Sequence, residues 1–527
     1  MRPFDHAGKF QGHAENAQLS RTTVRNAGIT IFAQGSVFAI QLLATFILAR
    51  ILTPADFGLV TMVTTFSLLL ASFGLAGFTE AVLQTEEINH LLASNLFWIN
   101  IGGGLVLSVA FGAAGSLLAR FYGDPRITNV SIGFSLAIFF SIVSVLHLSL
   151  LKRAMRFGAV SLNDIVGRLA YVLTAICCAC LGWGYWALVA GAVAQPIVVC
   201  IGAWILCPWL PGLPRRAPGT GKLVRYAIHV YGRYSLNYCT GNIDNLLVGW
   251  RFGASALGFY KKAFDLFVLP SCQLLSPILA VVVTTLSRKN KDIDEYKRYF
   301  LKGLCLVAFV GMAASADLTL IGRDVVRLLL GTKWGESGRI FTYFAPGIGI
   351  MLIYQTNGWI HLSLGTTGRW LRWTVIEVSV TAMLFLVALR WGPAGIAGAW
   401  TTSFCVLLIP AFWYAGKPIE LPVSSVIKAI WRYVVAALIA GLACALIVAP
   451  LRWPLLVAPV ALLGAITRIV TNSALFTLLY LGAVVVLFWS LEPLRQFVRL
   501  VPDLLPGVSS RRRSRSVGEP EHILSSR

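Results

Sequence analysis

Residues 242–270 read NIDNLLVGWRFGASALGFYKKAFDLFVLP, and their pattern recurs earlier in the chain. An apolar run that includes Asp244 ends at Arg251, and after a short break Gly258 opens a second apolar run. A carboxylate inside an apolar run is costly in a membrane, so its presence requires a functional or structural reason. The stretch therefore predicts two transmembrane helices joined by a turn at Arg-Phe-Gly.

Residues 46–62, FILARILTPADFGLVTM, follow the same order, since an apolar run ends at Arg50 and Gly58 opens the next one. The spacing from arginine to glycine is eight residues in this copy and seven in the other. A second pair of similar stretches is WGYWALVAG at 183–191 and WGPAGIAGA at 391–399. Both pairs are separated by about 200 residues, which indicates a duplicated unit of about six apolar segments.

The composition is that of an integral membrane protein. Of the 527 residues, 57% are hydrophobic and 13% are charged, whereas soluble proteins carry about 25% charged residues. The sequence contains no long polar stretch that could form a soluble domain. The ten cysteines lie in or beside apolar runs, and their spacing does not suit a metal site. We therefore expect neither a metal nor another cofactor.

Apolar runs of about 20 residues, long enough to cross a bilayer, predict an all-α integral membrane protein with about fourteen transmembrane helices. Two six-helix lobes related by the internal repeat are followed by two C-terminal helices. The predicted parts are a cytoplasmic N-terminal segment (1–26), an N-lobe (27–209), a cytoplasmic linker (210–227), a C-lobe (228–415), the extra helices (416–490), and an amphipathic stretch with a basic cytoplasmic tail (491–527). Residues 453–466 are apolar but short, so they either span the membrane or form a re-entrant segment.

The distribution of charge predicts the orientation of the chain. With the N-terminus inside, the segments that face the cytoplasm hold most of the 44 Lys and Arg residues, in agreement with the positive-inside rule. Both termini are then cytoplasmic. The net charge of +22 reflects this orientation and contact with anionic membrane lipids. A nucleic-acid partner is excluded, because it would need a folded basic domain.

Five stretches of the sequence resemble a known family. They are RILTPADFG (50–58), GWGYWA (182–187), DNLLVGWR (244–251), LGFY (257–260) and LSLGTTGR (362–369). They resemble the hallmark of Wzx-type polysaccharide flippases, which form the polysaccharide-transport branch of the multidrug/oligosaccharidyl-lipid/polysaccharide exporter superfamily. The resemblance extends from about residue 25 to about residue 490.

This resemblance implies a fold and a cargo. It implies two six-helix lobes around a central cavity that opens alternately to each face of the bacterial inner membrane. The cargo would be an oligosaccharide on undecaprenyl diphosphate, moved for exopolysaccharide, capsule or O-antigen synthesis, and no enzymatic activity is implied. The partners are then the lipid-linked oligosaccharide and membrane lipids. A polysaccharide polymerase and a chain-length regulator are further partners to test.

Ionisable residues inside the predicted spans are the candidates for transport. Arg168 and Arg233 lie about one turn inside spans, near the predicted cytoplasmic ends. They either extend to the lipid headgroups or face the cavity, where each guanidinium group would bind the diphosphate through two hydrogen bonds. Asp244 and Glu377, with Thr401, would hold a coupling cation or proton in the way that the resemblance implies. Alternatively, each carboxyl group has a structural role and is bonded to a neighbouring helix.

Two other classes of function stay open on the sequence alone. A drug or cation antiporter of the same superfamily would favour an acidic cavity, whereas the charges at the predicted inner ends are mainly basic. A membrane glycosyltransferase, polymerase or ligase would need a long extracytoplasmic loop or an acidic site there. The longest such loop predicted here, residues 321–339, has about 19 residues, and the Asp-x-Asp sequence at 292–294 lies in a lysine-rich cytoplasmic loop. We therefore predict a transporter.

Overall fold

The computed structural model describes residues 3–5, 8–10, 16–85, 88–215, 219–448, 461–490 and 495. In this part of the chain the regular secondary structure is helical, apart from two isolated β-bridges. The prediction of an all-α membrane protein is therefore confirmed. Residues 449–460 and the predicted tail, except Arg495, lie outside the described residues, so the behaviour of 453–466 stays a prediction.

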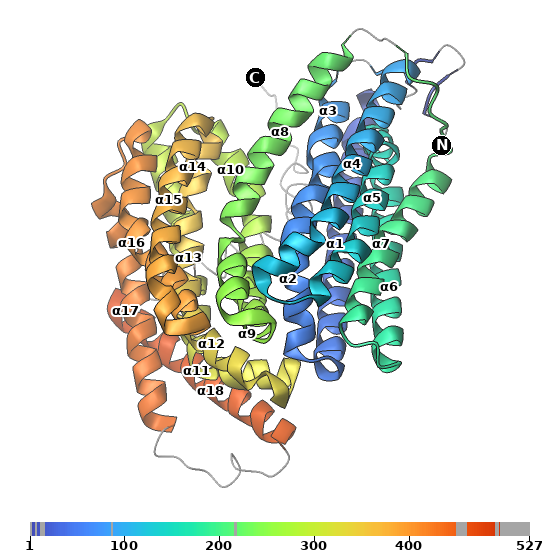
Figure 1. The fold of residues 1–527 in the computed structure, drawn as a ribbon. Helices are drawn as coiled ribbons and strands as arrows, with labels where there is room; N and C mark the ends of the chain where they lie inside the picture. Colours follow the sequence, from blue (N-terminus) through green and yellow to red (C-terminus); the bar gives the residue numbers. More distant parts are fainter. Residues whose placement is uncertain are drawn as a thin grey trace, which may run out of the picture. The chain divides into compact units, whose positions relative to one another are not determined.

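The chain divides into two compact units, which Figure 1 shows as bundles of helices. Unit 1 comprises Met1–Lys261 and Leu329–Trp334, and unit 2 comprises Lys262–Leu328 and Gly335–Arg527. The boundary at Lys261 lies inside a helix, whereas the predicted lobes meet at the 210–227 linker. The division into lobes therefore stays a prediction.

Most helices of unit 1 are long, and they pack against helices both adjacent and distant in the sequence. They are α1 (Asn16–Ile51), α2 (Pro54–Ser72), the π-helical segment η1 (Phe73–Phe78), α3 (Thr79–Gln84), α4 (His90–Tyr122), α5 (Arg126–Arg153), α6 (Phe157–Cys180), α7 (Tyr185–Leu206), α8 (Thr220–Thr240) and α9 (Ile243–Pro270), whose last part belongs to unit 2. The closest pairs are α4 with α5, α6 with α7, α5 with α7, and α1 with α6.

Unit 2 contains the remaining helices. They are η2 (Ser271–Leu275), α10 (Ser276–Arg288), α11 (Ile293–Leu330), α12 (Gly335–Phe344), α13 (Gly347–Gln355), α14 (Asn357–Ser363), α15 (Thr367–Ala388), η4 (Leu389–Trp391), α16 (Gly392–Gly416), η5 (Lys417–Ile419), α17 (Val423–Val448) and α18 (Ala461–Phe488); the short η3 (Thr332–Trp334) belongs to unit 1. Helix α18 is fastened to α11 by polar contacts, among them Arg468 with Asp324 at 2.7 Å and Ser473 with Asp317 at 2.9 Å.

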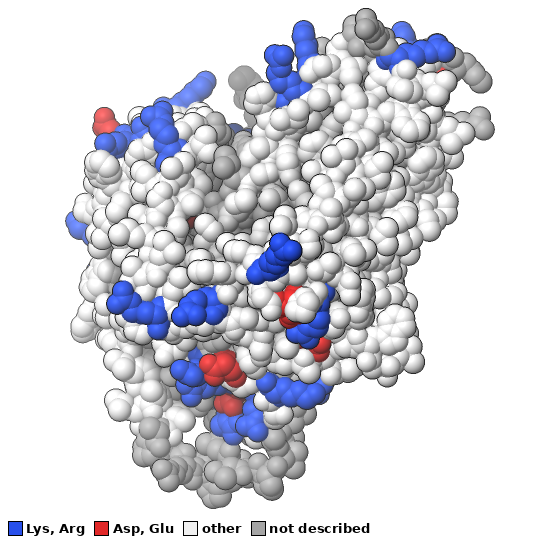
Figure 2. Space-filling view, in the orientation of Figure 1, with Lys and Arg blue, Asp and Glu red and all other residues white. Residues whose placement is uncertain are grey.

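Ten helical stretches of the described chain, one of which runs through α15 and α16, are long and apolar enough to cross a membrane, so the chain is a multi-pass membrane protein. Helices suit this environment because they satisfy their own backbone hydrogen bonds in the absence of water. In the view of Figure 2, Lys, Arg, Asp and Glu side chains lie mainly towards the ends of the helices. The surface between them is largely uncharged, as contact with lipid requires.

The predicted break in residues 242–270 lies at Gly253. Its φ of +80° and ψ of −179° interrupt α9, so the helix is two helices joined at one residue. The repeat also extends further than the sequence indicated. Helix α2 runs into the π-helical η1 19 residues after Pro54, and α9 runs into the π-helical η2 17 residues after Ala254. π-Helical turns are rare, so their occurrence in both copies supports the duplication.

The start of the predicted linker lies along the first turns of α4. The Trp98 indole donates a hydrogen bond to the Gly212 carbonyl at 2.9 Å, and the Gly212 amide donates to Ser94 at 2.9 Å. The Arg215 amide donates to the side-chain oxygen of Asn95 at 3.0 Å. Helix α8 then begins at Thr220, so residues 210–227 contain a docked segment and the first two turns of a helix.

Candidate functional site

Backbone contact at two glycines joins the two repeated stretches within unit 1. Helix α2 begins at Pro54, the second half of α9 begins at Ala254, and Gly58 and Gly258 each lie one turn further on. A Cβ atom on Gly58 would stand 1.7 Å from the Ala254 carbonyl oxygen, and one on Gly258 would stand 1.8 Å from the Pro54 carbonyl oxygen. The helices therefore cross with their backbones in contact, which small residues four apart permit.

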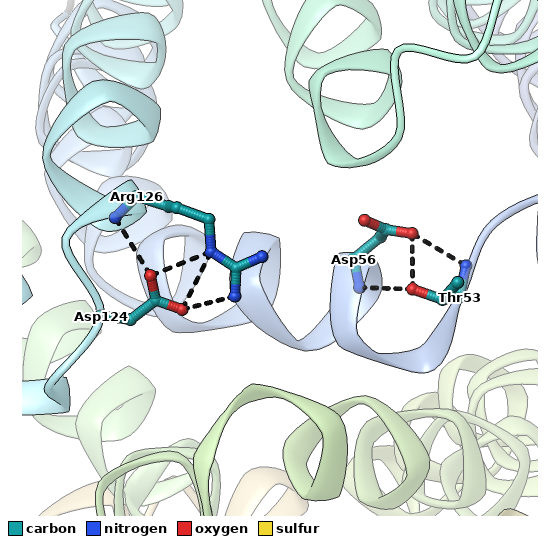
Figure 3. A network of polar contacts seen from close by, with 4 residues as sticks. All are labelled: Thr53, Asp56, Asp124 and Arg126. Carbon is teal, nitrogen blue, oxygen red and sulfur yellow. Dashed lines mark hydrogen bonds and ion pairs between the residues drawn. The ribbon is translucent and has the colours of Figure 1, made fainter.

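Polar contacts fix the turns at this end of unit 1, which the charge distribution predicts to be extracytoplasmic (Figure 3). The Thr53 amide donates to the Asp56 carboxylate at 2.9 Å, and the Asp56 amide donates to the Thr53 hydroxyl at 3.3 Å, which is a capping box. In the α4–α5 turn, the Arg126 guanidinium donates to the Asp124 carboxylate at 2.7 and 3.0 Å. These side-chain hydrogen bonds from Arg126 hold the pKa of Asp124 below its usual value.

Arg168, predicted as a diphosphate ligand, lies on α6 and points towards α1. Its Nη1 donates to the Gln41 side-chain oxygen at 2.9 Å, and its Nε is buried without a hydrogen-bond partner among the described residues. A guanidinium group held by one neighbour keeps donors for an anion. The geometry is compatible with the diphosphate role, which stays a prediction.

Arg233, the second predicted ligand, belongs to α8, but its side chain lies outside the described residues. Three basic residues on α8 precede it at one-turn intervals, Lys222, Arg225 and His229, and all three are exposed. Helical periodicity puts the position of Arg233 on the same face. We call these four positions the basic face of α8. The one-turn spacing of residues 222, 225, 229 and 233 is visible in the sequence. The sequence does not show which face of this helix packs against other helices, so it does not show that the basic residues are exposed.

The opposite face of α8 packs on η1 and α2. A Cβ atom on Gly77 would stand 2.6 Å from the Ala227 carbonyl oxygen, and the Tyr231 hydroxyl donates to the Leu69 carbonyl at 3.1 Å. Ala227 is therefore level with Gly77, which lies about 10 Å along the helix axis from the end of α3 at Gln84. The basic face consequently begins near the predicted cytoplasmic end of unit 1 and continues towards the membrane interior.

Asp244, predicted to bind a coupling ion, is fully buried in the first half of α9. The Tyr260 hydroxyl donates to its carboxylate at 2.8 Å, and the Asn245 amide donates to the other oxygen at 2.8 Å. Because Tyr260 lies in the second half of α9, the carboxylate links the two helices on either side of Gly253. This geometry matches the structural alternative for Asp244.

Glu377 and Thr401, the other two candidates for ion coupling, lie in unit 2, whereas Asp244 lies in unit 1. Glu377 on α15 interacts with the Tyr354 hydroxyl, which also accepts a hydrogen bond from the Trp373 indole at 2.9 Å. The Thr401 hydroxyl on α16 donates to the Tyr343 carbonyl at 2.9 Å. Among the described residues, no group of three or more His, Cys, Asp or Glu side chains could hold a metal ion. The coupling role of these residues stays a prediction.

Comparison with known proteins identifies the family. The family model described as polysaccharide biosynthesis protein matches residues 47–339, which is more than half of the chain and includes both repeated stretches. The chain belongs to the polysaccharide biosynthesis protein family. Membership confirms the resemblance to polysaccharide flippases that the motifs at 50–58 and 244–251 indicated.

Several proteins that are similar to this chain are named for the polysaccharide whose synthesis they serve. The chain is 23% identical over 324 residues to the lipopolysaccharide biosynthesis protein WzxC of Escherichia coli K12, covering 60% of this chain and 65% of the relative. It is 22% identical over 332 residues to the succinoglycan biosynthesis transport protein ExoT of Rhizobium meliloti, covering 63% and 67%. It is 22% identical over 370 residues to the teichuronic acid biosynthesis protein TuaB of Bacillus subtilis, covering 68% and 74%. The matches thus span about two thirds of the length of the first two relatives.

Solved structures establish the same fold for this family member. The lipid II flippase MurJ, in an inward closed conformation, matches with a TM-score of 0.70 at 13% identity, over 88% of this chain and 99% of that one. An inward-facing multidrug transporter of the MATE family matches with a TM-score of 0.59 at 12% identity, over 74% and 95%. The expected exporter-superfamily fold is therefore confirmed.

Proposed function

We propose that this protein is a transporter that moves an oligosaccharide linked to undecaprenyl diphosphate across the bacterial inner membrane. The observation that carries the proposal is the basic face of α8, with Lys222, Arg225 and His229 exposed on one side of a helix in a membrane protein. Relatives named for lipopolysaccharide, succinoglycan and teichuronic acid synthesis support a polysaccharide precursor as cargo. The fold shared with a lipid II flippase supports a lipid-linked form.

The basic face of α8 needs water or an anionic partner. Cationic side chains inside a membrane are costly against lipid, so they face water-filled cavities or partners of opposite charge. The other side of α8 is occupied by η1 and α2 through Ala227 and Tyr231. The basic face then lines an aqueous path that begins near the predicted cytoplasmic end, and a diphosphate is an anion that suits the positive charges of Lys222 and Arg225.

Arg168 and Arg233 are the proposed ligands of the diphosphate deeper in the path. A guanidinium group matches two phosphate oxygens at once, and the free Nε of Arg168 leaves this possible. Protonation or cation binding at Asp244 and Glu377, with Thr401, would couple transport to an ion gradient. The membrane potential is a second source of energy, because moving each negative charge outward gains about 2.3 kcal/mol per 100 mV.

We infer an inner-membrane protein with both termini in the cytoplasm and no enzymatic activity, so reporter fusions after residues 220 and 515 should both report the cytoplasm. A polysaccharide polymerase and a chain-length regulator are proposed partners. A drug or cation antiporter is the alternative within the same fold, and the basic charge of α8 disfavours it because a cationic cargo would be repelled.

The test measures where the cargo accumulates. In cells that express each variant at the wild-type level, leaflet-specific labelling should find lipid-linked oligosaccharide retained on the cytoplasmic leaflet with Arg168→Ala and with Arg225→Glu. Arg168→Lys should restore export in part, because lysine keeps the charge but lacks the planar fork. Lys291→Glu is the matched control, since Lys291 is exposed in the loop after α10. Wild-type export by Arg168→Ala and Arg225→Glu would contradict the proposed path.

A further inference from the structure

A six-residue segment, formed by the last two residues of α11 and the turn before α12, belongs to unit 1, although the rest of α11 and all of α12 belong to unit 2. The chain leaves unit 2 after Leu328, contributes Leu329–Trp334 to unit 1, and returns at Gly335. Gly331 makes the turn with a φ of +98°, which favours glycine. Directly after it, η3 presents Trp334 to unit 1, and the Trp334 amide donates to the Gly331 carbonyl at 3.2 Å.

Trp334 is buried between parts of both repeated stretches. Its side chain is 0% exposed, and its indole nitrogen donates to the Ala49 carbonyl near the end of α1 at 2.8 Å. The ring lies 5.5 Å from the ring of Phe57 on α2 and 6.0 Å from that of Phe259 on α9, in edge-to-face geometry with both. Such ring pairs are favourable beyond simple burial. One side chain therefore bridges the two copies of the repeat.

The bridge stands beside the crossing of α2 and α9. Phe57 precedes Gly58 and Phe259 follows Gly258, so Trp334 contacts the neighbours of both glycines whose backbones touch. The contact at the glycines is made by backbone atoms. Trp334 adds a large apolar contact that spans both helices.

We propose that Leu329–Trp334 is a latch that holds the α2 and α9 helix starts together, and that Trp334 must withdraw before these helices can separate at the predicted extracytoplasmic end. The latch is continuous with α11, a single helix of 38 residues that is about 57 Å long. Because α11 ends one residue before Gly331, a tilt of α11 in unit 2 pulls directly on the segment that carries Trp334. The latch is thus a device by which unit 2 controls a contact inside unit 1.

Hydrogen–deuterium exchange of the full-length protein in lipid nanodiscs, without cargo, tests the latch. Trp334→Ala should raise exchange about tenfold or more in the peptides that cover residues 46–62 and 250–262, because opening there becomes easier. A tryptophan that does not hold the two helix starts together would leave exchange in both peptides at the wild-type level. The matched control is Trp183→Ala, an exposed tryptophan in the α6–α7 turn of the same unit, which should leave both peptides unchanged.

A milder variant covers the case in which Trp334→Ala does not fold. Trp334→Phe keeps one aromatic ring but removes the hydrogen bond to Ala49 and part of the buried ring volume, so exchange should rise in residues 46–62 and less in 250–262. Wild-type exchange in both stretches, with either folded variant, overturns the latch. The role of this latch in transport rests on the proposed function, and export measured by leaflet labelling tests that function separately. Loss of the exchange effect would therefore count against the latch alone.

Discussion

The two repeated stretches make the same turn with different chemistry. In the first, Leu52 and Thr53 separate α1 from α2, and a capping box with Asp56 starts the new helix. In the second, Gly253 alone separates the two halves of α9, with a backbone conformation that only glycine adopts readily. The extra residue in the first turn accounts for the one-residue difference in spacing between arginine and glycine.

What the two stretches share is the distance from helix start to glycine. Pro54 and Gly58 in the first copy correspond to Ala254 and Gly258 in the second, and each glycine contacts the first residue of the other helix. The repeat therefore preserves the crossing, while the turn that leads to it is free to vary. Substitutions at three places in unit 1 test this comparison.

The largest expected effect is at the crossing itself. Gly58→Leu and Gly258→Leu should each destabilise the protein by about 3 kcal/mol or more, because side-chain atoms would overlap a backbone carbonyl that cannot move away. The midpoint of thermal unfolding in nanodiscs should fall by similar amounts for the two variants. Gly441→Leu in α17 is the control, since a Cβ atom there meets open space. A wild-type midpoint of thermal unfolding for either variant would show that the two glycines do not contribute equally to the crossing.

An intermediate effect is expected at the two turns. Gly253→Ala should cost about 1–3 kcal/mol through backbone strain alone, because no atom lies within 4 Å of the added methyl group. Thr53→Ala should cost about 1 kcal/mol, as the loss of a helix N-cap does. The midpoints of thermal unfolding of both variants check that Gly253→Ala is the more destabilising substitution. A larger effect for Thr53→Ala would mean that the second turn tolerates substitution better than its φ indicates.

The smallest effect concerns the charges beside the first turn. Asp124→Asn should destabilise the protein by less than about 1 kcal/mol at pH 7, because the Arg126 side chain is 50% exposed and the ion pair is screened. The pKa of Asp124 is lowered in the folded protein, so this stabilisation is present above the ordinary aspartate pKa and is lost as the pH falls through the lowered value. Unfolding midpoints of variant and wild type should therefore converge in acid. A difference that persists in acid would assign the effect to packing.

Much of the fold could be predicted because its signals are local. The run of apolar segments, the break at Arg-Phe-Gly and the repeat are each contained in short stretches of sequence. The crossing and the latch could not be predicted in this way. Apolar periodicity identifies the faces of a helix but not the partner of each face, and Trp334 lies in the short turn between α11 and α12, 285 residues from the carbonyl that it binds.

The candidate site was predicted in part for the same reason. Arg168 was identified from its depth in a span, but its contact with Gln41 joins helices far apart in sequence. Asp244 was identified from its cost in a membrane, whereas its partner Tyr260 depends on how the chain folds back at Gly253. The row Lys222, Arg225 and His229 became informative only once Ala227 and Tyr231 were known to pack.

Reconstitution into sealed vesicles tests transport most directly. The vesicles would contain the full-length protein and lipid-linked oligosaccharide from a strain that makes the corresponding polysaccharide. A water-soluble reagent added outside would modify the sugar in the outer leaflet only. We expect the protected pool to become accessible faster than in protein-free vesicles, and Arg168→Ala to slow this exchange while the protein stays folded. Equal rates with and without folded wild-type protein would contradict the proposal that this chain moves lipid-linked oligosaccharide.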